Sequence, residues 1–169
     1  MGDVLRGILP LSLWNPKPTS GVYNGVMPIV LKEREVRRAI QSWLFRNNWG
    51  RNYQEKETHE QGIDIKVRHN DYSRYFLIET KGGSTAKSAR SMAETSFVYS
   101  LGQIVTRMKA VDARYYYGLG LPHASAMIAV RRIPWQFAKK MLIHVFSVDV
   151  TGKVTLFTWK HMRDCQKAT

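Results

Sequence analysis

The chain has 169 residues, 44% of them hydrophobic, which is enough for one domain with a sizeable core. Lys and Arg number 26 against 13 Asp and Glu, a formal net charge of +13, which favours nucleic acid as a partner over an ordinary basic surface. A membrane span, a disulfide scaffold and a zinc-thiolate site are not expected, because no run approaches 18 apolar residues and Cys165 is the single cysteine. We therefore expect a cytoplasmic, nucleoid-associated protein.

The N-terminal stretch differs in composition from the rest of the chain. The first 28 residues contain four of the six prolines and show no sustained apolar period. We expect an irregular arm over residues 1–28 and a single domain over residues 29–169. A short apolar run in the arm is interrupted by Pro10 and lacks a small-residue cleavage site, so it does not predict a signal peptide.

The first regular element predicted is a helix between Leu31 and Asn48, where apolar residues recur at helical spacing. Glu33 falls near the middle of the apolar stripe if each residue turns by about 100°. An acid on the core-facing side of a helix is costly unless it is paired or bound to a metal ion. The alternative is that Glu33 lies in the first turn, beyond the core, where a negative charge is favourable.

Three strands are predicted next in the chain. Residues 52–58 are polar and suit an edge strand, whereas residues 63–67 alternate strictly between apolar and polar. Residues 75–81 are apolar on both faces, as expected of a central strand, and Gly82 and Gly83 end it.

The second half of the chain predicts one long helix, a strand, a short helix and a hairpin. The ranges are a loop over 84–95, a helix over 97–108, a connection over 118–122, a strand over 124–130, a short helix over 134–140, and hairpin strands over 142–150 and 154–159. This order predicts an α/β core with a mixed sheet flanked by helices.

The predicted hairpin between the second and third strands brings two acidic residues together. A turn centred between Asp71 and Tyr72 pairs positions whose numbers sum to 143. Asp64 then lies opposite Glu79, with Cβ atoms roughly 5 Å apart. Lys81 follows Glu79 by two residues and therefore points to the same face.

Two explanations of this cluster stay open at the level of the sequence. Neighbouring carboxylates repel each other unless a cation neutralises them, and Mg²⁺ prefers oxygen ligands. Cross-strand salt bridges, Glu79 with Lys81 and Asp64 with Lys66, are the commoner outcome for such pairs. The apolar run before Glu79 would bury the charges, however, and buried charges usually serve a function.

The order of these features resembles the PD-(D/E)XK nuclease superfamily, which has an acid on a first helix, an Asp entering one strand and Glu-x-Lys on the next. The matching residues are Glu33, Asp64 and Glu79-Thr80-Lys81. The Glu-Arg-Glu-Val segment at 33–36 resembles archaeal-type Holliday-junction resolvases, and the Gly-Ile-Asp-Ile segment at 62–65 resembles Mrr-like restriction endonucleases. The resemblance covers about residues 31–110 and departs from the pattern before the Asp, where Ile stands in place of the usual Pro. It implies a restriction-endonuclease-like core of the order α-β-β-β-α-β, with a C-terminal hairpin and the N-terminal arm added.

The resemblance also implies an endonuclease that hydrolyses DNA phosphodiester bonds with Mg²⁺ or Mn²⁺. Asp64, Glu79 and the backbone carbonyl of Thr80 would bind the metal, and Glu33 would complete the shell through water. Lys81 would orient or deprotonate the attacking water and stabilise the transition state. Junctions or branched DNA would be the substrate, or the enzyme would act in restriction, repair or recombination.

Further residues are candidates for contacts with DNA. Some relatives carry a Gln on the second helix and, in the RecB-like version, a Tyr four residues later; here these positions hold Gln103 and Arg107. A helical projection places Gln103 off the apolar stripe, which favours an exposed surface residue. Basic residues that flank the site, each either a phosphate contact or a solvated charge, are Lys87, Arg90, Arg107 and Lys109.

A second basic group consists of Arg131-Arg132 and Lys139-Lys140, with Trp135 between the two pairs. Stacking of Trp135 on an unpaired base competes with core packing as an explanation. DNA is the expected partner, bound by a homodimer if two strands are cut, or within a larger DNA-processing complex. Two other functions stay open: a non-catalytic nucleic-acid-binding module that keeps the nuclease fold, and a basic structural protein of a nucleoprotein assembly.

Overall fold

The computed structural model describes residues 30–51, 62–83 and 89–168, so the predicted arm and the predicted strand over 52–58 lie outside the described residues. Five strands of the described part form one sheet in the order β1-β2-β3-β4-β5. Their bounds are Ile65–Arg68 for β1, Tyr75–Thr80 for β2, Tyr115–Pro122 for β3, Ile143–Val148 for β4 and Val154–Phe157 for β5. The three central strands are parallel, and each edge strand runs antiparallel to its neighbour. The fold is α/β with a mixed sheet, as predicted.

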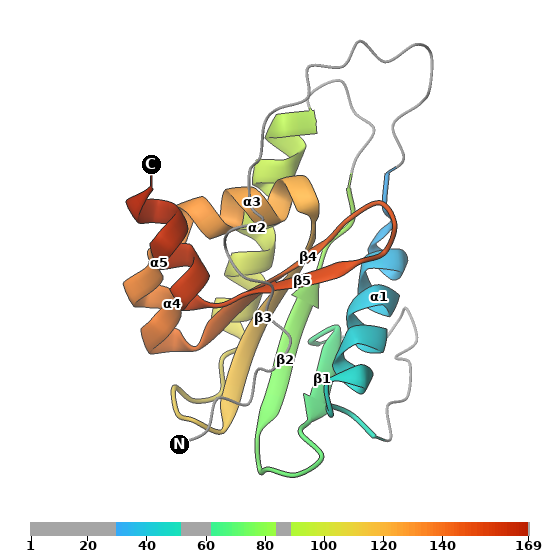
Figure 1. Ribbon diagram of the computed structural model, residues 1–169, viewed down its shortest axis with the longest axis vertical. Helices are drawn as coiled ribbons and strands as arrows, with labels where there is room; N and C mark the ends of the chain where they lie inside the picture. Colours follow the sequence, from blue (N-terminus) through green and yellow to red (C-terminus); the bar gives the residue numbers. More distant parts are fainter. Residues whose placement is uncertain (1–29, 52–61, 84–88, 169) are drawn as a thin grey trace.

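Helices cover both faces of the sheet (Figure 1). One face carries α1 (Glu33–Arg46), and the other carries α2 (Ala89–Thr106), α3 (His123–Arg132), α4 (Trp135–Met141) and α5 (Trp159–Lys167). Because helices lie on both sides, every residue of β4 is buried. None of the described helices combines the length and the apolar character that crossing a membrane requires.

Helix α1 confirms the first helix predicted from the sequence. Val36, Ile40 and Leu44 recur every four residues and are almost completely buried against the sheet. The carboxylate of Glu35 accepts a hydrogen bond from the backbone N–H of Lys32 at 2.7 Å, which satisfies one of the free donors at the start of the helix. This local hydrogen bond fixes where α1 begins.

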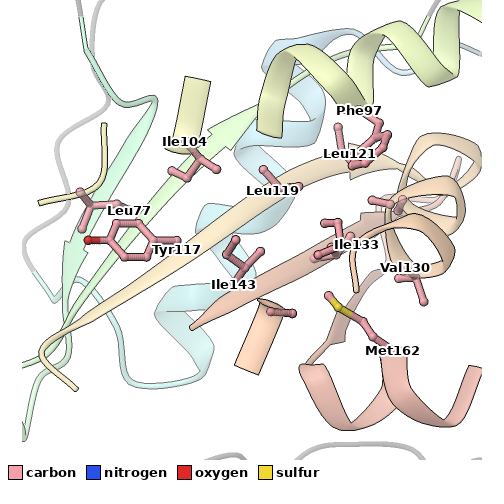
Figure 2. Packing of buried hydrophobic residues seen from close by; sticks show 14 residues of the cluster. Leu77, Phe97, Ile104, Tyr117, Leu119, Leu121, Val130, Ile133, Ile143 and Met162 are labelled. Carbon is pink, nitrogen blue, oxygen red and sulfur yellow. The ribbon is translucent and has the colours of Figure 1, made fainter. Parts of the chain in front are cut away.

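The larger core lies between the sheet and α2–α5 (Figure 2). Its labelled side chains come from the central strands and from the helical layer: Leu77, Phe97, Ile104, Tyr117, Leu119, Leu121, Val130, Ile133, Ile143 and Met162. The hydroxyl of Tyr117 donates to Ala110 O at 2.6 Å and accepts hydrogen bonds from the backbone N–H groups of Lys109 and Ala110 at 3.0 and 3.1 Å. This buried network holds the segment that follows α2 against the sheet.

The structure corrects the prediction for the segment around β3. Residues 124–130 were predicted as a strand but belong to helix α3, and the strand β3 occupies the stretch that was predicted as a connection. Two glycines suggested that connection, but they serve close packing in a central strand. A Cβ on Gly118 would lie 2.7 Å from Ile78 Cγ1, and a Cβ on Gly120 would lie 2.4 Å from Ile40 Cδ1.

Element boundaries differ at two further places. Helix α2 begins at Ala89, inside the loop predicted over residues 84–95. The predicted short helix and hairpin are present as α4 and β4–β5, but β5 ends at Phe157 and the unpredicted helix α5 follows. The backbone N–H of Thr158 donates to His161 Nδ1 at 3.0 Å, so α5 begins with a local side-chain cap rather than with an apolar period.

Candidate active site

The β1–β2 hairpin has the register that the sequence predicted. The pairs run from Ile65–Ile78 to Arg68–Tyr75, and the residue numbers of each pair sum to 143. Asp64 directly precedes β1 and is therefore placed opposite Glu79, near the end of β2. The hairpin thus brings both carboxylates to the same end of the sheet.

Asp64 is tied to the end of β2 by two hydrogen bonds. The backbone N–H of Thr80 donates to Asp64 Oδ2 at 2.7 Å, and the hydroxyl of Thr80 donates to the same oxygen at 2.9 Å. These bonds orient the carboxylate and use only one of its two oxygens. Asp64 makes no ion pair with Lys66 among the described residues, so this predicted salt bridge is absent from that part of the chain.

Glu79 is a buried acid with a cationic partner. Its side chain is 1% exposed, and Oε1 forms an ion pair with Nη1 of Arg107, which follows the last residue of α2. The same Nη1 donates to Gly62 O at 3.0 Å. Arg107 therefore joins the end of β2 to the segment that leads into β1.

Burial raises the pKa of Glu79 above the ordinary value for a glutamate, and the negative charge of Asp64 raises it further. The hydrogen bond and the charge of Arg107, and the charge of Lys81, act in the opposite direction and lower the pKa. Because Asp64 affects the protonation of Glu79, the two carboxylates interact electrostatically. This is the mutual repulsion that a shared cation would relieve.

Lys81 and Glu33 form a second charged pair beside the first. Lys81 Nζ lies 3.7 Å from Glu33 Oε2, and the two side chains are 26% and 45% exposed. Glu33 lies in the first turn of α1, which agrees with the predicted alternative of an acid beyond the core. The predicted salt bridge between Glu79 and Lys81 is replaced by two other ion pairs. Glu79 pairs with Arg107, and Lys81 pairs with Glu33.

The two glycines after β2 allow this second pair to form. A Cβ on Gly82 would lie 2.6 Å from the backbone N of Glu33, so only glycine permits the start of α1 to approach so closely. The backbone N–H of Gly83 donates to Leu31 O at 2.8 Å. Close approach of the two segments brings Glu33 to Lys81.

The predicted DNA-contacting residues are placed differently from one another. Arg107 lies at the carboxylates, whereas Arg90 is exposed near the start of α2, with Nε 4.0 Å from Glu94 Oε1, and Lys87 lies outside the described residues.

Gln103 was expected to be an exposed residue, and this is wrong. Its Oε1 is buried without a hydrogen-bond partner in the described part of the chain, one helical turn before Arg107. The predicted stripe does face the core, where Phe97 and Ile104 are buried, but Gln103 beside it is only partly exposed and its amide oxygen is turned inward.

The residues present fit a small, hard cation bound by few protein ligands. Within residues 30–51, 62–83 and 89–168, no three His, Cys, Asp or Glu side chains are grouped to hold a metal ion, so Glu33 does not join Asp64 and Glu79 as a direct ligand there. Mg²⁺ commonly takes one or two carboxylates and fills the rest of its shell with water and substrate oxygens. Asp64, Glu79 and the adjacent Thr80 carbonyl form a donor set of this kind.

The second basic group lies on the helical layer of α3, α4 and α5. Trp135 packs against the larger core, in agreement with core packing rather than a free stacking surface. Sequence reasoning missed Trp159, whose ring has Lys139 Nζ 4.9 Å from its centroid and lies 6.2 Å from the ring of Trp135. No local pattern links Lys139 to Trp159, because their proximity follows from the packing of α4 on α5.

No protein-family model, curated protein sequence or solved structure matches this chain. The geometry of Asp64, Glu79, Lys81 and Arg107 is therefore the basis for assigning a function.

Proposed function

We propose that this chain is a divalent-metal-dependent endonuclease that hydrolyses DNA phosphodiester bonds, built on a restriction-endonuclease-like core. The observation that carries the proposal is the pair of facing acids at the end of the β1–β2 hairpin. One of them, Glu79, is 1% exposed. Burying a carboxylate beside a second carboxylate is costly, and functional sites are where such a cost is usually found.

The chemistry of the proposed site follows from the groups it contains. Asp64 and Glu79 would hold Mg²⁺ or Mn²⁺ together with the backbone carbonyl of Thr80. When bound, such an ion lowers the pKa of a coordinated water and neutralises charge that develops on a phosphate. Asp64 keeps one oxygen free of the Thr80 hydrogen bonds, so it can serve as a ligand without losing its orientation.

Lys81 is the proposed catalytic amine. Its partner Glu33 holds Nζ at the edge of the site through a contact of 3.7 Å between partly exposed groups. Exposed ion pairs are weak, so Nζ is free to turn towards a bound phosphate and its attacking water. There it would orient the water and stabilise negative charge in the transition state. Glu33 is the proposed positioning residue for Lys81.

DNA is the proposed substrate because the chain has a formal charge of +13 and the site suits a phosphodiester. A junction or branched substrate, or a role in restriction, repair or recombination, follows only from the resemblance to archaeal-type resolvases and Mrr-like enzymes. A homodimer would match the twofold symmetry of duplex DNA if both strands are cut.

One observation favours a second candidate function, a non-catalytic nucleic-acid-binding module with the same fold. Arg107 forms an ion pair with Glu79, so the protein itself supplies a counter-charge for this acid. In such a module, Arg107 would be a permanent counter-ion and Asp64 a permanent acceptor for Thr80. The protein would then bind DNA equally well with and without divalent ions.

Cleavage assays separate the two functions. Labelled linear, branched and single-stranded DNA would be incubated with the protein in Mg²⁺, Mn²⁺ or EDTA, alongside Asp64→Asn and Lys81→Met. Lys66→Met is the matched control, because Lys66 is an exposed lysine on the same hairpin. Metal-dependent cutting that both site variants lose and the control keeps supports the nuclease. DNA binding without cutting in every buffer rejects it and supports the binding module.

A further inference from the structure

Arg107 holds the most buried acid of the candidate site from a partly exposed position. Its side chain is 33% exposed, whereas that of Glu79 is 1% exposed. The guanidinium makes two contacts through one nitrogen, to Glu79 Oε1 and to Gly62 O at 3.0 Å. Arg107 can therefore withdraw towards solvent, but Glu79 cannot.

Arg107 and a divalent cation compete for the same carboxylate. A metal ion between Asp64 and Glu79 would bring two further positive charges next to the guanidinium, and like charges at such distances repel strongly. Asp64 does not ease this conflict, because its hydrogen bonds come from Thr80 and its charge is needed by the ion. Repulsion therefore disfavours holding both cations at Glu79, and Arg107 is the one that has room to move.

A guanidinium that leaves Glu79 needs another anion. The group is planar and presents several donors, which match the oxygens of a phosphate. Phosphate is the anion that a nuclease substrate brings to this end of the sheet. Lys109, two residues further on, is exposed and adds positive charge on the same segment.

We infer that Arg107 is an exchangeable counter-ion: it pairs with Glu79 while the site holds no metal ion, and it turns to a DNA phosphate when a metal ion takes its place. This inference rests on the proposed nuclease function. It makes Arg107 a positioning residue that couples metal binding to DNA binding, in addition to any direct contact with substrate.

The first test measures Mn²⁺ binding without DNA by isothermal titration calorimetry at pH 8. Arg107→Met removes the competing charge, so it should bind Mn²⁺ roughly tenfold more tightly than the wild type. Arg107→Lys keeps the charge and should stay close to the wild type. Arg132→Met is the matched control, because Arg132 forms an ion pair with Glu94 at 3.0 Å on the helical layer, and it should not change the affinity. Equal or weaker binding in Arg107→Met would overturn the inference.

The second test uses the wild-type protein and so does not depend on the stability of a variant. In arginine side-chain NMR spectra, the Nε–H of Arg107 should shift and exchange faster with water when Mg²⁺ is added, because its guanidinium leaves a buried acid. A spectrum in which this signal is unchanged at saturating Mg²⁺ would overturn the inference.

The third test measures the coupling in a Lys81→Met background, so that the DNA stays intact. Adding Mn²⁺ should raise DNA affinity about tenfold more with Arg107 than with Arg107→Met, because binding free energies of coupled ligands are reciprocal. In EDTA the two proteins should bind DNA equally. An identical gain with Mn²⁺ in both proteins would show that Arg107 does not couple the two ligands.

These tests distinguish failure of the inference from failure of the proposed function. If the wild type binds Mn²⁺ and Asp64→Asn does not, the metal site stands, and an unchanged Arg107→Met then refutes only the exchange. If neither the wild type nor Arg107→Met binds Mn²⁺, the proposed nuclease and the exchange fail together.

Discussion

Glu79 and His144 are both buried in central strands of the sheet, but the structure satisfies them in different ways. Glu79 lies near the end of β2 and is paired with the partly exposed Arg107. His144 lies inside β4 among aromatic rings, with the centroids of Phe76 and Tyr116 both 5.3 Å away, and its Nδ1 lies 3.0 Å from Leu142 O. One group is held by a charge and the other by a backbone carbonyl.

The two environments shift protonation in ways that fit different roles. Burial lowers the pKa of His144 from 6.5 to about 4, so the ring stays neutral at physiological pH and acts as a core residue that is hydrogen-bonded to the backbone of Leu142 and Tyr117. Burial raises the pKa of Glu79, but Arg107 and Lys81 oppose the shift. His144 therefore has the environment of a structural core residue, whereas Glu79, buried beside a second acid and paired with Arg107, has the environment on which the proposed site rests.

The first prediction, with the greatest effect, concerns DNA cleavage by variants that lack one of the two facing acids. Asp64→Asn and Glu79→Gln each remove a negative charge that would hold the metal ion, a loss of several kcal/mol that should lower cleavage roughly a thousandfold or more. Asp112→Asn is the control, since Asp112 forms an ion pair with the nearby Arg114 on the surface, away from the carboxylates of the site. Full cleavage by Asp64→Asn in a single-turnover assay would rule out the site.

The second prediction concerns how the free energy of unfolding depends on pH through the protonation of His144. The unfolded chain binds a proton near pH 6.5, whereas the folded chain resists protonation of His144 until about pH 4. The free energy of unfolding should therefore fall as the pH drops below 6.5, by about 3 kcal/mol from this residue when pH 4 is reached. Urea denaturation across this range would measure it.

His144→Leu is the variant that isolates this contribution, and its stability should depend less on pH over the same interval. Glu79 acts in the opposite sense, because its folded pKa is raised and its protonation favours the folded state as the pH falls. The burial of His69 and His161 lowers their pKa values as well, so some pH dependence should remain in the variant. A slope identical to that of the wild type would contradict the assignment of His144.

The third prediction concerns the hydrogen bonds of the buried Tyr117 hydroxyl, which hold the segment next to Arg107. Tyr117→Phe leaves the backbone N–H groups of Lys109 and Ala110 without their buried acceptor. The loss should lower the free energy of unfolding by about 2 kcal/mol. Cleavage should fall as well, because this network holds the segment that follows Arg107. A melt unchanged from the wild type would show that water replaces the hydroxyl.

The smallest expected effect concerns Gln103, whose Oε1 is buried without a partner in the described residues. Gln103→Leu removes this unsatisfied oxygen and should raise the free energy of unfolding by up to about 1 kcal/mol. Gln136→Leu on the exposed side of α4 is the control and should bring no gain. A clear loss of stability in Gln103→Leu would mean that the amide has a partner.

Much of the fold and part of the site could be predicted from local patterns. The spacing of Val36, Ile40 and Leu44 predicted α1, and alternation together with the turn at Asp71-Tyr72 predicted the β1–β2 register. Gly118 and Gly120 misled the prediction of β3, because glycine marks both turns and places where side chains of neighbouring elements approach closely.

By itself the sequence determined which residues share a face of the hairpin, because side chains alternate along a strand and the turn sets the pairing. The placement of Asp64 opposite Glu79 could therefore be predicted from local patterns alone. The ion-pair partners of the site residues follow only from how the helices pack on the sheet. Glu79 pairs with Arg107 at the end of α2, and Lys81 pairs with Glu33 at the start of α1. Those residues come from elements on opposite faces of the sheet, and no local period records how helices dock on it.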